Sequence, residues 1–288
     1  MKKKGIMIVA FLILLAGAGV YFYPDISDLY YRTEAASRIK EYQKGVQGLS
    51  TSETDVMIAK AQEFNSRLSG SLSTDPFETG DVNPYEGDEE YNDLLNINGV
   101  MGYIDIPKID VYLPVYHGTS ASTLKKGAGH LYGSALPAGG SGTHSVISAH
   151  RGLPSAKLFT DLDQMHKGDI FYFHLFDRVM AYQVDEIETV EPTKLELLDP
   201  VPGKEYMTLF TCTPYGVNSH RLLVRGIRIP YEVTNAASAA EQAGTDGPRM
   251  EAPLPAAVRM AIAAVIIILL SAAVYMCRRR RNGKRGKR

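Results

Sequence analysis

Residues 208–226, TLFTCTPYGVNSHRLLVRG, place a cysteine and an arginine at the facing ends of two apolar segments. Met207–Cys212 and Leu222–Ile229 are short and rich in apolar and β-branched residues, which is typical of strands. The residues between them, TPYGVNS, are rich in turn formers. The sequence therefore predicts a β-hairpin that brings Cys212 close to Arg221.

Similar short runs, broken by Gly and Pro, extend upstream to Gly99. Further strands are predicted at Gly102–Ile106, Val111–Val115, Ser145–Ala149, Ile170–Phe176 and Val179–Glu188. A helical stretch is predicted near Leu158–Gln164. About seven or eight short strands with few helices indicate a mainly β domain, either a closed barrel or a sandwich.

The region before the strands is polar and predicted to be helical. Apolar residues recur at helical spacing in two sets: Ala35, Ile39, Tyr42 and Val46, then Met57, Ala61, Phe64 and Leu68. Ser50 and Glu53 match a capping box for the second helix. Residues 69–90, SGSLSTDPFETGDVNPYEGDEE, favour an irregular loop because they are rich in Gly, Ser, Pro and acids.

Two apolar runs lie near the ends of the chain. Residues 5–23 follow three lysines and are long enough to cross a bilayer. They fit a signal peptide or an uncleaved anchor, and their length favours the anchor. Residues 260–276 precede Cys277 and the basic tail RRRRNGKRGKR. The positive-inside rule then predicts a two-pass protein in the cell membrane, with both termini cytoplasmic and an extracellular domain between the two helices.

The chain is thereby divided into six segments. They are an anchor (1–23), a helical region with the loop (24–96), the β domain (97–231), a flexible linker (232–255), a second transmembrane helix (256–277) and a basic cytoplasmic tail (278–288).

The charges differ between the ends and the middle of the chain. The whole sequence has 31 basic and 32 acidic residues, but 11 of the basic residues flank the apolar runs. The remainder has 20 basic and 32 acidic residues, a net charge near −12. Such a domain is not expected to bind nucleic acid, and the basic tail beside an apolar run is better explained as a topology signal.

Cys212 is the one cysteine expected outside the membrane, because Cys277 lies at the cytoplasmic end of the second run. A lone cysteine is often a small buried apolar residue, but an exported thiol is better explained if its thiolate reacts. A reactive thiolate needs a cation and a proton donor nearby. Arg221 and His150, at the end of a predicted strand, are candidates. The other histidines remain alternatives: His117, His130, His144, His166, His174 and His220.

The string Thr208–Cys212, TLFTC, resembles the TLxTC signature of sortases, the cysteine transpeptidases of Gram-positive cell surfaces. The longer string 208–226 resembles the pilus-assembling class C group, and the resemblance extends over about residues 102–231, including YIDIPKIDVYLPV and SAHRG. It implies an eight-stranded sortase β-barrel, preceded by helices and a lid loop, with His150, Cys212 and Arg221 as the catalytic set.

The resemblance also implies a reaction. Cys212 would attack the Thr–Gly bond of an LPxTG-like sorting signal, and His150, as imidazolium, would protonate the leaving amine. Arg221 would hold the substrate backbone or oxyanion, and Thr208 and Thr211 would bind substrate. The expected partners are pilin or surface proteins with such signals and an acceptor lysine of a pilin, and no metal or organic cofactor is expected.

Asp75, Pro76 and Phe77 resemble the lid motif of class C sortases. The Asp75 carboxylate could pair with Arg221, Phe77 could exclude water from Cys212, and Pro76 could stiffen the turn. Read without the family, Asp-Pro is a common turn dipeptide. Phe77 stands where the family often has Trp, which predicts a looser lid.

Three other functions fit the sequence less well. A papain-like protease has its cysteine before its histidine, the reverse of the order here. A housekeeping sortase, which joins proteins to a wall precursor, fits the lid and the second apolar run less well. A non-enzymatic adhesion or sensor module would leave the TLFTC hairpin and the HRG turn without a role.

Overall fold

The computed structural model describes residues 2–68, 75, 77 and 87–231, with the side chains of residues 2–10 left out. The predicted role of Pro76, the linker, the second transmembrane helix, Cys277 and the basic tail therefore lie outside the described residues.

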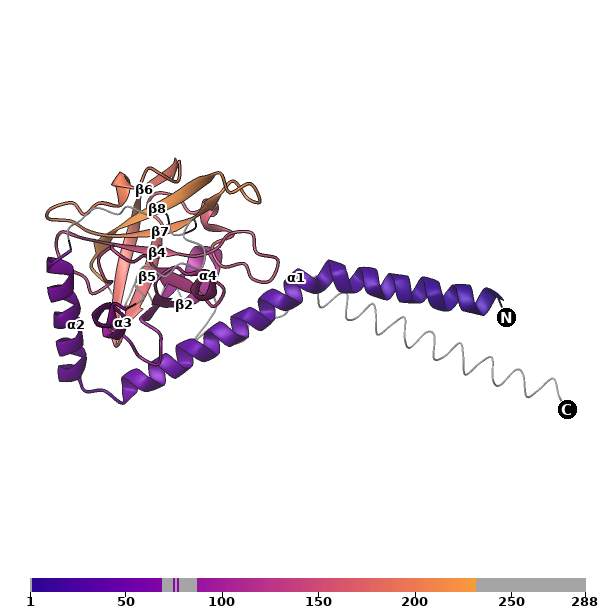
Figure 1. Cartoon of the computed structure of the whole chain (residues 1–288), viewed down its shortest axis with the longest axis horizontal. Coiled ribbons are helices and arrows are strands. Elements are labelled where there is room, and N and C mark those ends of the chain that lie inside the picture. Colours follow the sequence, from indigo (N-terminus) through magenta and orange to yellow (C-terminus); the bar gives the residue numbers. More distant parts are fainter. Residues whose placement is uncertain (1, 69–74, 76, 78–86, 232–288) are drawn as a thin grey trace. The chain divides into compact units, whose positions relative to one another are not determined.

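Eight strands close into a barrel, which confirms the closed alternative of the fold prediction (Figure 1). They are β1 (Gly102–Ile106), β2 (Val111–His117), β3 (Ala128–His130), β4 (Thr143–Ser148), β5 (Ile170–Leu175), β6 (Arg178–Val190), β7 (Glu205–Thr213) and β8 (His220–Ile229). The order around the barrel is β1-β2-β3-β4-β7-β8-β6-β5, and β5 pairs with β1 to complete it. β4 and β7 pair in parallel, and β7 and β8 form the predicted antiparallel hairpin.

Two details differ from the sequence predictions. β3 was not predicted, because its three residues, Ala-Gly-His, are too few to show an alternating pattern. The stretch Leu158–Gln164 is not an α-helix: it contains turns and ends in the short 3₁₀ helix η2 (Leu162–Gln164). Two other 3₁₀ turns are η1 (Pro107–Ile109) and η3 (Glu196–Leu198).

Four α-helices are present among the described residues: α1 (Lys2–Gln47), α2 (Thr51–Ser66), α3 (Glu89–Asp93) and α4 (Ala121–Leu124). α1 continues through Pro24, so the expected boundary at residue 23 is not a helix end. The capping box of α2 is confirmed, since Ser50 and Glu53 bond reciprocally. Within the described part of the chain, α1 alone is long and apolar enough to cross a membrane, over a segment beginning at Phe11. Among the described residues, 2–29 belong to a compact unit separate from the one that contains the barrel.

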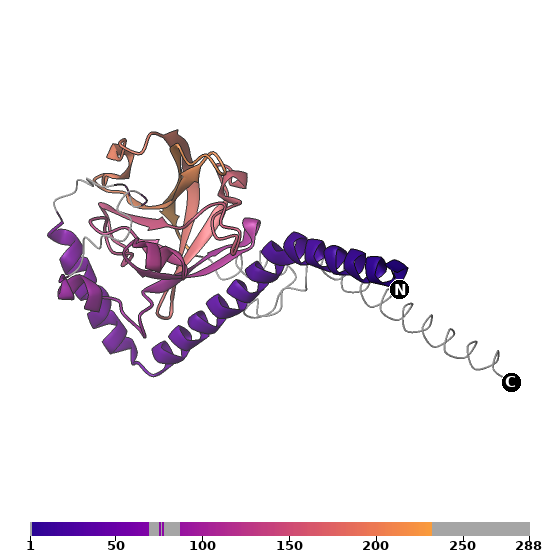
Figure 2. The same ribbon diagram turned by 45° about the vertical axis from the view of Figure 1, so that its right-hand side comes forward.

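α2 and the C-terminal part of α1 flank the barrel (Figure 2). From α1, Tyr42 is fully buried and accepts a hydrogen bond of 2.7 Å from the Phe176 backbone N–H. From α2, Asn65 donates to the Leu136 carbonyl at 2.9 Å and accepts from the Leu136 N–H at 2.7 Å. α2 is thus fixed to the barrel one turn before the segment that carries Asp75.

The strands β4, β7 and β8 bury both faces. The interior of the barrel holds residues such as Ile147, Leu209 and Val224. The opposite face holds a smaller cluster of six apolar residues: Leu131, Val146, Leu195, Leu198, Phe210 and Leu223. We call this cluster the outer cluster. Because side chains alternate along a strand, Cys212 shares its face with Phe210 of the outer cluster.

Candidate active site

The register of three neighbouring strands brings His150, Cys212 and Arg221 into one row. Cys212 is directly opposite Arg221 in the β7–β8 pair. In the parallel β4–β7 pair, Ser148 is opposite Phe210, and the Ala149 N–H continues the ladder by donating to the Phe210 carbonyl at 3.2 Å. His150, two residues beyond Ser148, therefore lies at the level of Cys212, on the side of β7 opposite to Arg221. Neighbouring strands lie about 4.8 Å apart, so the row places a base and a cation beside the thiol.

The thiol of Cys212 is held in its neutral form. The residue is 8% exposed, and burial raises the pKa of the thiol. The guanidinium of Arg221 acts in the opposite direction, and the carboxylate of Asp75 raises the pKa further. Because desolvation is the largest of these effects, removing the cover over Cys212 would favour the thiolate.

His150 is also held in its neutral form. Burial lowers the pKa of its imidazole, and the ammonium of Lys125 lowers it further. The site as it stands thus favours a thiol and a neutral imidazole rather than a thiolate–imidazolium pair. The imidazolium expected from the sequence requires a more solvated site than this one.

Arg221 is paired with Asp75, as the lid prediction requires. Its Nε lies 2.7 Å and its Nη2 2.5 Å from Asp75 Oδ2, and the two side chains are 6% and 1% exposed. Nη1 donates to the carbonyls of Asn218 and His220 at 2.9 and 3.1 Å. These bonds engage all three guanidinium nitrogens, so Arg221 has little capacity left for a substrate oxygen in this state.

Phe77 covers the row on its solvent side. Its ring centroid is 5.6 Å from that of His150 and 6.0 Å from that of Phe210, with the Phe210 ring nearly parallel. Arg221 lies 5.5 Å from the same ring centroid. The Phe77 N–H donates to Asp75 Oδ1 at 2.9 Å, which couples the two lid residues. Asp75 and Phe77 together form a closed cover, which we call the lid.

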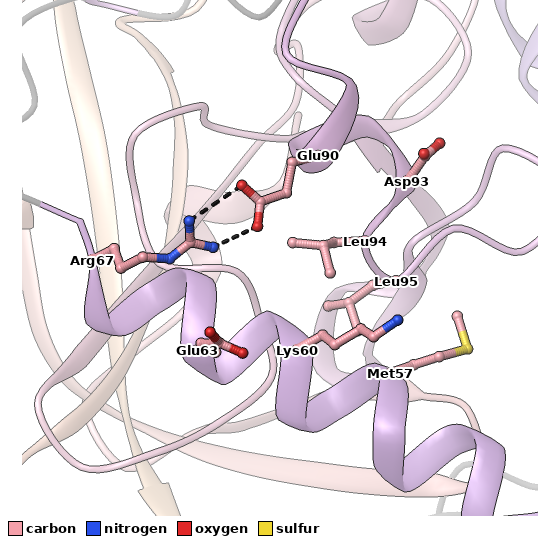
Figure 3. A pocket seen from close by; sticks show the side chains of 8 residues that line it. All are labelled: Met57, Lys60, Glu63, Arg67, Glu90, Asp93, Leu94 and Leu95. Carbon is pink, nitrogen blue, oxygen red and sulfur yellow. Dashed lines mark hydrogen bonds and ion pairs between the residues drawn. The ribbon is translucent and has the colours of Figure 1, made fainter.

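The two ends of the segment that carries the lid are joined by an ion pair. Arg67, which ends α2, and Glu90, in α3, form a forked contact with a shortest distance of 2.5 Å (Figure 3). The pair lines a pocket of about 550 Å³ together with residues of α2, such as Lys60, and with Leu94 and Leu95, which follow α3. None of the catalytic candidates lines this pocket.

The other histidines do not join the row. His117, His130 and His144 are buried and bonded internally: His117 Nε2 to the Leu94 carbonyl, His130 Nδ1 to Tyr91 Oη, and His144 Nε2 to Thr208 Oγ1. His174 stacks on Tyr103, and His166 contacts Lys108. His220 precedes Arg221 on β8 and so points to the other face.

Thr208 and Thr211, which the resemblance gives as substrate-binding residues, are hydrogen-bonded within the protein in this state. Thr208 is 1% exposed and its Oγ1 lies 2.7 Å from His144 Nε2. Thr211 is fully buried and donates to the Ala149 carbonyl at 2.7 Å. Thr211 points to the face opposite Cys212. In this state both hydroxyls brace the barrel around the row rather than line a substrate surface.

Phe210 is a site residue that sequence reasoning missed. Its ring is the platform on which Phe77 stacks. The signal was present, because a residue two positions from Cys212 on one strand must share its face. Among the residues that the structure describes, no group of three His, Cys, Asp or Glu side chains could hold a metal ion.

Comparison with protein families gives one matching domain. Residues 104–229 match the sortase domain. The sortase A of Streptococcus agalactiae serotype III is 35% identical over 117 residues, which cover 40% of this chain and 47% of that protein. The sortase A of Bacillus anthracis is 30% identical over 138 residues, or 48% of this chain and 64% of that protein. The chain thus spans about half to two thirds of the length of these curated relatives.

Solved structures match over more of the chain. Sortase C of Streptococcus pneumoniae is 50% identical, with a TM-score of 0.62, and the match covers 68% of this chain and 97% of that one. Sortase C-1 of Actinomyces oris is 42% identical, with a TM-score of 0.59 and coverage of 62% and 99%. Sortase C1 of Streptococcus agalactiae is 40% identical, with a TM-score of 0.63 and coverage of 69% and 98%.

Proposed function

The chain belongs to the sortase family, and we propose that it is a pilus-assembling class C enzyme, a cysteine transpeptidase with a lid over its active site. Solved sortase C structures resemble it over most of their length, and the S. pneumoniae structure is described in relation to pilin substrate specificity. The observation that carries the proposal is the row of His150, Cys212 and Arg221 beneath Asp75 and Phe77.

The first half of the reaction begins when the lid leaves. Solvent then reaches Cys212 and His150, and Arg221 loses its carboxylate partner, so a thiolate becomes more favourable. The proton of the Cys212 thiol passes to His150, the thiolate attacks the carbonyl carbon of Thr in an LPxTG-like signal, and Arg221 donates to the oxyanion. The C–N bond breaks, His150 gives its proton to the departing glycine amine, and a thioester on Cys212 remains.

The second half transfers the acyl group to an amine. His150, now neutral, removes a proton from the incoming amine, which attacks the thioester carbonyl. The C–S bond breaks, an amide forms, and Cys212 leaves as a thiolate. We propose that the amine is the side chain of a lysine on the next pilin subunit. The reaction requires neither a metal nor an organic cofactor, because a thiol, an imidazole and a guanidinium supply each step.

The same proposal places the enzyme in the cell membrane with its barrel outside. The apolar segment of α1 and the basic residues at both ends of the chain support a two-pass topology with cytoplasmic termini. Cleavage by a protease added to intact cells, read with antibodies to each terminus, tests this orientation. Removal of either terminal epitope from intact cells would contradict it.

The enzyme activity is tested with the full chain in detergent. The Asp75→Ala variant is incubated with an LPxTG-like peptide, and intact-protein mass spectrometry should show the acyl adduct on Cys212. Addition of a lysine-containing pilin peptide should then convert the adduct to an amide product. The matched control is Cys212→Ala, which should form no adduct.

Two results would count against the proposal. Absence of an adduct with a panel of sorting-signal peptides, in a folded protein, would reject the transpeptidase assignment. Transfer to a wall-precursor amine in preference to the pilin lysine would instead assign the chain to the housekeeping type.

A further inference from the structure

The imidazole of His150 lacks a hydrogen-bonded partner among the residues that the structure describes. Its recorded neighbours are the ring of Phe77 and the charge of Lys125. In most nucleophile–base pairs a third group hydrogen-bonds the base and sets its orientation. On the proposed function, Phe77 leaves before substrate binds. The orientation of His150 must then be set by contacts of its backbone and its neighbours, because its imidazole has no hydrogen-bonded partner among the described residues.

Arg151, the next residue, has the contacts for this role. Its side chain is 7% exposed, and its nitrogens reach three acceptors on two segments, the loop that contains residues 160–163 and the end of β7. Nη1 donates to Thr213 Oγ1 at 2.9 Å, Nε donates to the Thr160 carbonyl at 3.1 Å, and Nη2 lies 2.5 Å from Asp163 Oδ2. Thr213 directly follows Cys212 on β7, so Arg151 ties the residue after the base to the residue after the nucleophile.

The residue before His150 is tied in a matching way. The Ala149 carbonyl accepts a hydrogen bond of 2.7 Å from Thr211 Oγ1, and Thr211 directly precedes Cys212. The backbone of His150 is fixed as well, because its carbonyl accepts a bond of 3.1 Å from the Phe159 N–H. The residues on either side of His150 are therefore each hydrogen-bonded to a residue next to Cys212: Ala149 to Thr211, and Arg151 to Thr213.

We propose that Arg151 is a positioning residue that fixes His150 relative to Cys212, through the backbone rather than through the imidazole. The inference rests on the proposed function, because it assigns Arg151 a part in that same acyl transfer. A planar fork of fixed N–H donors suits three acceptors at set positions, and the ammonium of lysine cannot satisfy them together. A misplacement of about 1 Å in a catalytic pair can cost about 100-fold in rate.

The test uses the full chain carrying Asp75→Ala, so that lid opening does not limit the rate. In that background we expect Arg151→Lys to lower kcat for peptide cleavage by about 10- to 100-fold and to change KM less than about twofold. Alkylation of Cys212 by iodoacetamide, measured above the midpoint of its pH dependence where the thiol is already ionised, should keep its rate. The matched control is Arg178→Lys, because Arg178 forms an ion pair with Asp55 away from the row.

A second pair of variants keeps the test valid if Arg151→Lys folds poorly. Thr213→Val removes the acceptor of Arg151 and keeps the side-chain shape, and Thr213→Ser keeps the hydroxyl. We expect the valine variant to reproduce part of the kcat loss, and the serine variant to retain kcat within about twofold.

Two outcomes would overturn the inference. One is an unchanged kcat in both Arg151→Lys and Thr213→Val. The other is a loss of kcat matched by an equal loss of folded protein in thermal denaturation, which indicates a structural role alone. If the parent Asp75→Ala protein forms no adduct at all, the proposed function fails, and that result is distinct from either outcome for Arg151.

Discussion

Two arginines whose side chains are almost fully covered lie near the nucleophile, and each is paired with an aspartate. The Arg221–Asp75 and Arg151–Asp163 pairs have the same shortest distance, 2.5 Å, and the arginine side chains are 6% and 7% exposed. The aspartates differ. Asp75 is 1% exposed and lies 146 residues from its arginine, whereas Asp163 is 52% exposed and only 12 residues from its own.

The difference in sequence separation indicates that Asp163 stays with its arginine, whereas Asp75 can separate from Arg221. Asp163 is part of the same loop region as Arg151, so the pair stays together as long as that loop is folded. Asp75 lies far from Arg221 in the sequence, outside the strands, so on the proposed function it can separate from Arg221 while the strands keep their pairing. We therefore expect the pair at Arg221 to open during the reaction and the pair at Arg151 to stay closed.

The largest effect is expected from substitution of Arg221, which pairs with the lid residue Asp75. Arg221→Ala should lower kcat/KM for sorting-signal peptides by about 100- to 1000-fold, because the oxyanion loses its donor. Arg221→Lys should recover little, since the fork is lost. Steady-state kinetics with a fluorogenic peptide measure this. If Arg221→Ala kept activity within about threefold of the wild type, Arg221 would not take part in the reaction.

Removing the partner of Arg221 should act in the opposite direction. Asp75→Ala should raise peptide turnover by about 10-fold, because two charge-assisted hydrogen bonds that hold the lid closed are lost. The pKa of the Cys212 thiol should fall, since its burial and the Asp75 carboxylate both raise it now. The midpoint of iodoacetamide alkylation against pH should therefore move to lower pH. An unchanged midpoint and turnover would contradict the gating role of the lid.

The smallest effect is expected from the exposed aspartate. Asp163→Asn should change turnover less than about twofold and lower the free energy of unfolding by less than about 1 kcal/mol, since exposed ion pairs contribute little. Arg151 keeps its bonds to Thr213 and to the Thr160 carbonyl. Urea denaturation and peptide kinetics check both values. A loss as large as that of Arg151→Lys would show that the carboxylate, rather than the fork, positions the loop.

The sequence predicted those parts of the site that local patterns encode. The β7–β8 hairpin and its Cys212–Arg221 pairing followed from two apolar runs and a turn-rich link, and the lid residues followed from the family resemblance. The choice of His150 over six other histidines could not be made from pattern. It depends on the parallel pairing of β4 with β7, whose residues are separated by more than 50 positions.

Two contacts that the sequence did not predict are long-range. Phe77 stacks on Phe210, and Arg151 donates to Thr213. Each pair joins segments far apart in the sequence, and the periodic patterns that predict helices and strands say nothing about such contacts. The raised pKa of the Cys212 thiol and the lowered pKa of the His150 imidazole both depend mainly on burial, which follows from tertiary packing.

The covalent attachment of the lid to the barrel has a consequence for competition at the active site. Asp75 and Phe77 belong to a segment whose two ends meet at the exposed Arg67–Glu90 pair, and because that segment is part of the same chain they behave as a ligand attached to its own receptor. Short attachments of this kind give effective concentrations on the order of millimolar. A dilute peptide with weaker affinity therefore occupies the site for only a small fraction of the time. On the proposed function, we expect a pilin held on the same membrane to be concentrated near the barrel and to compete with the lid better than a dilute peptide does.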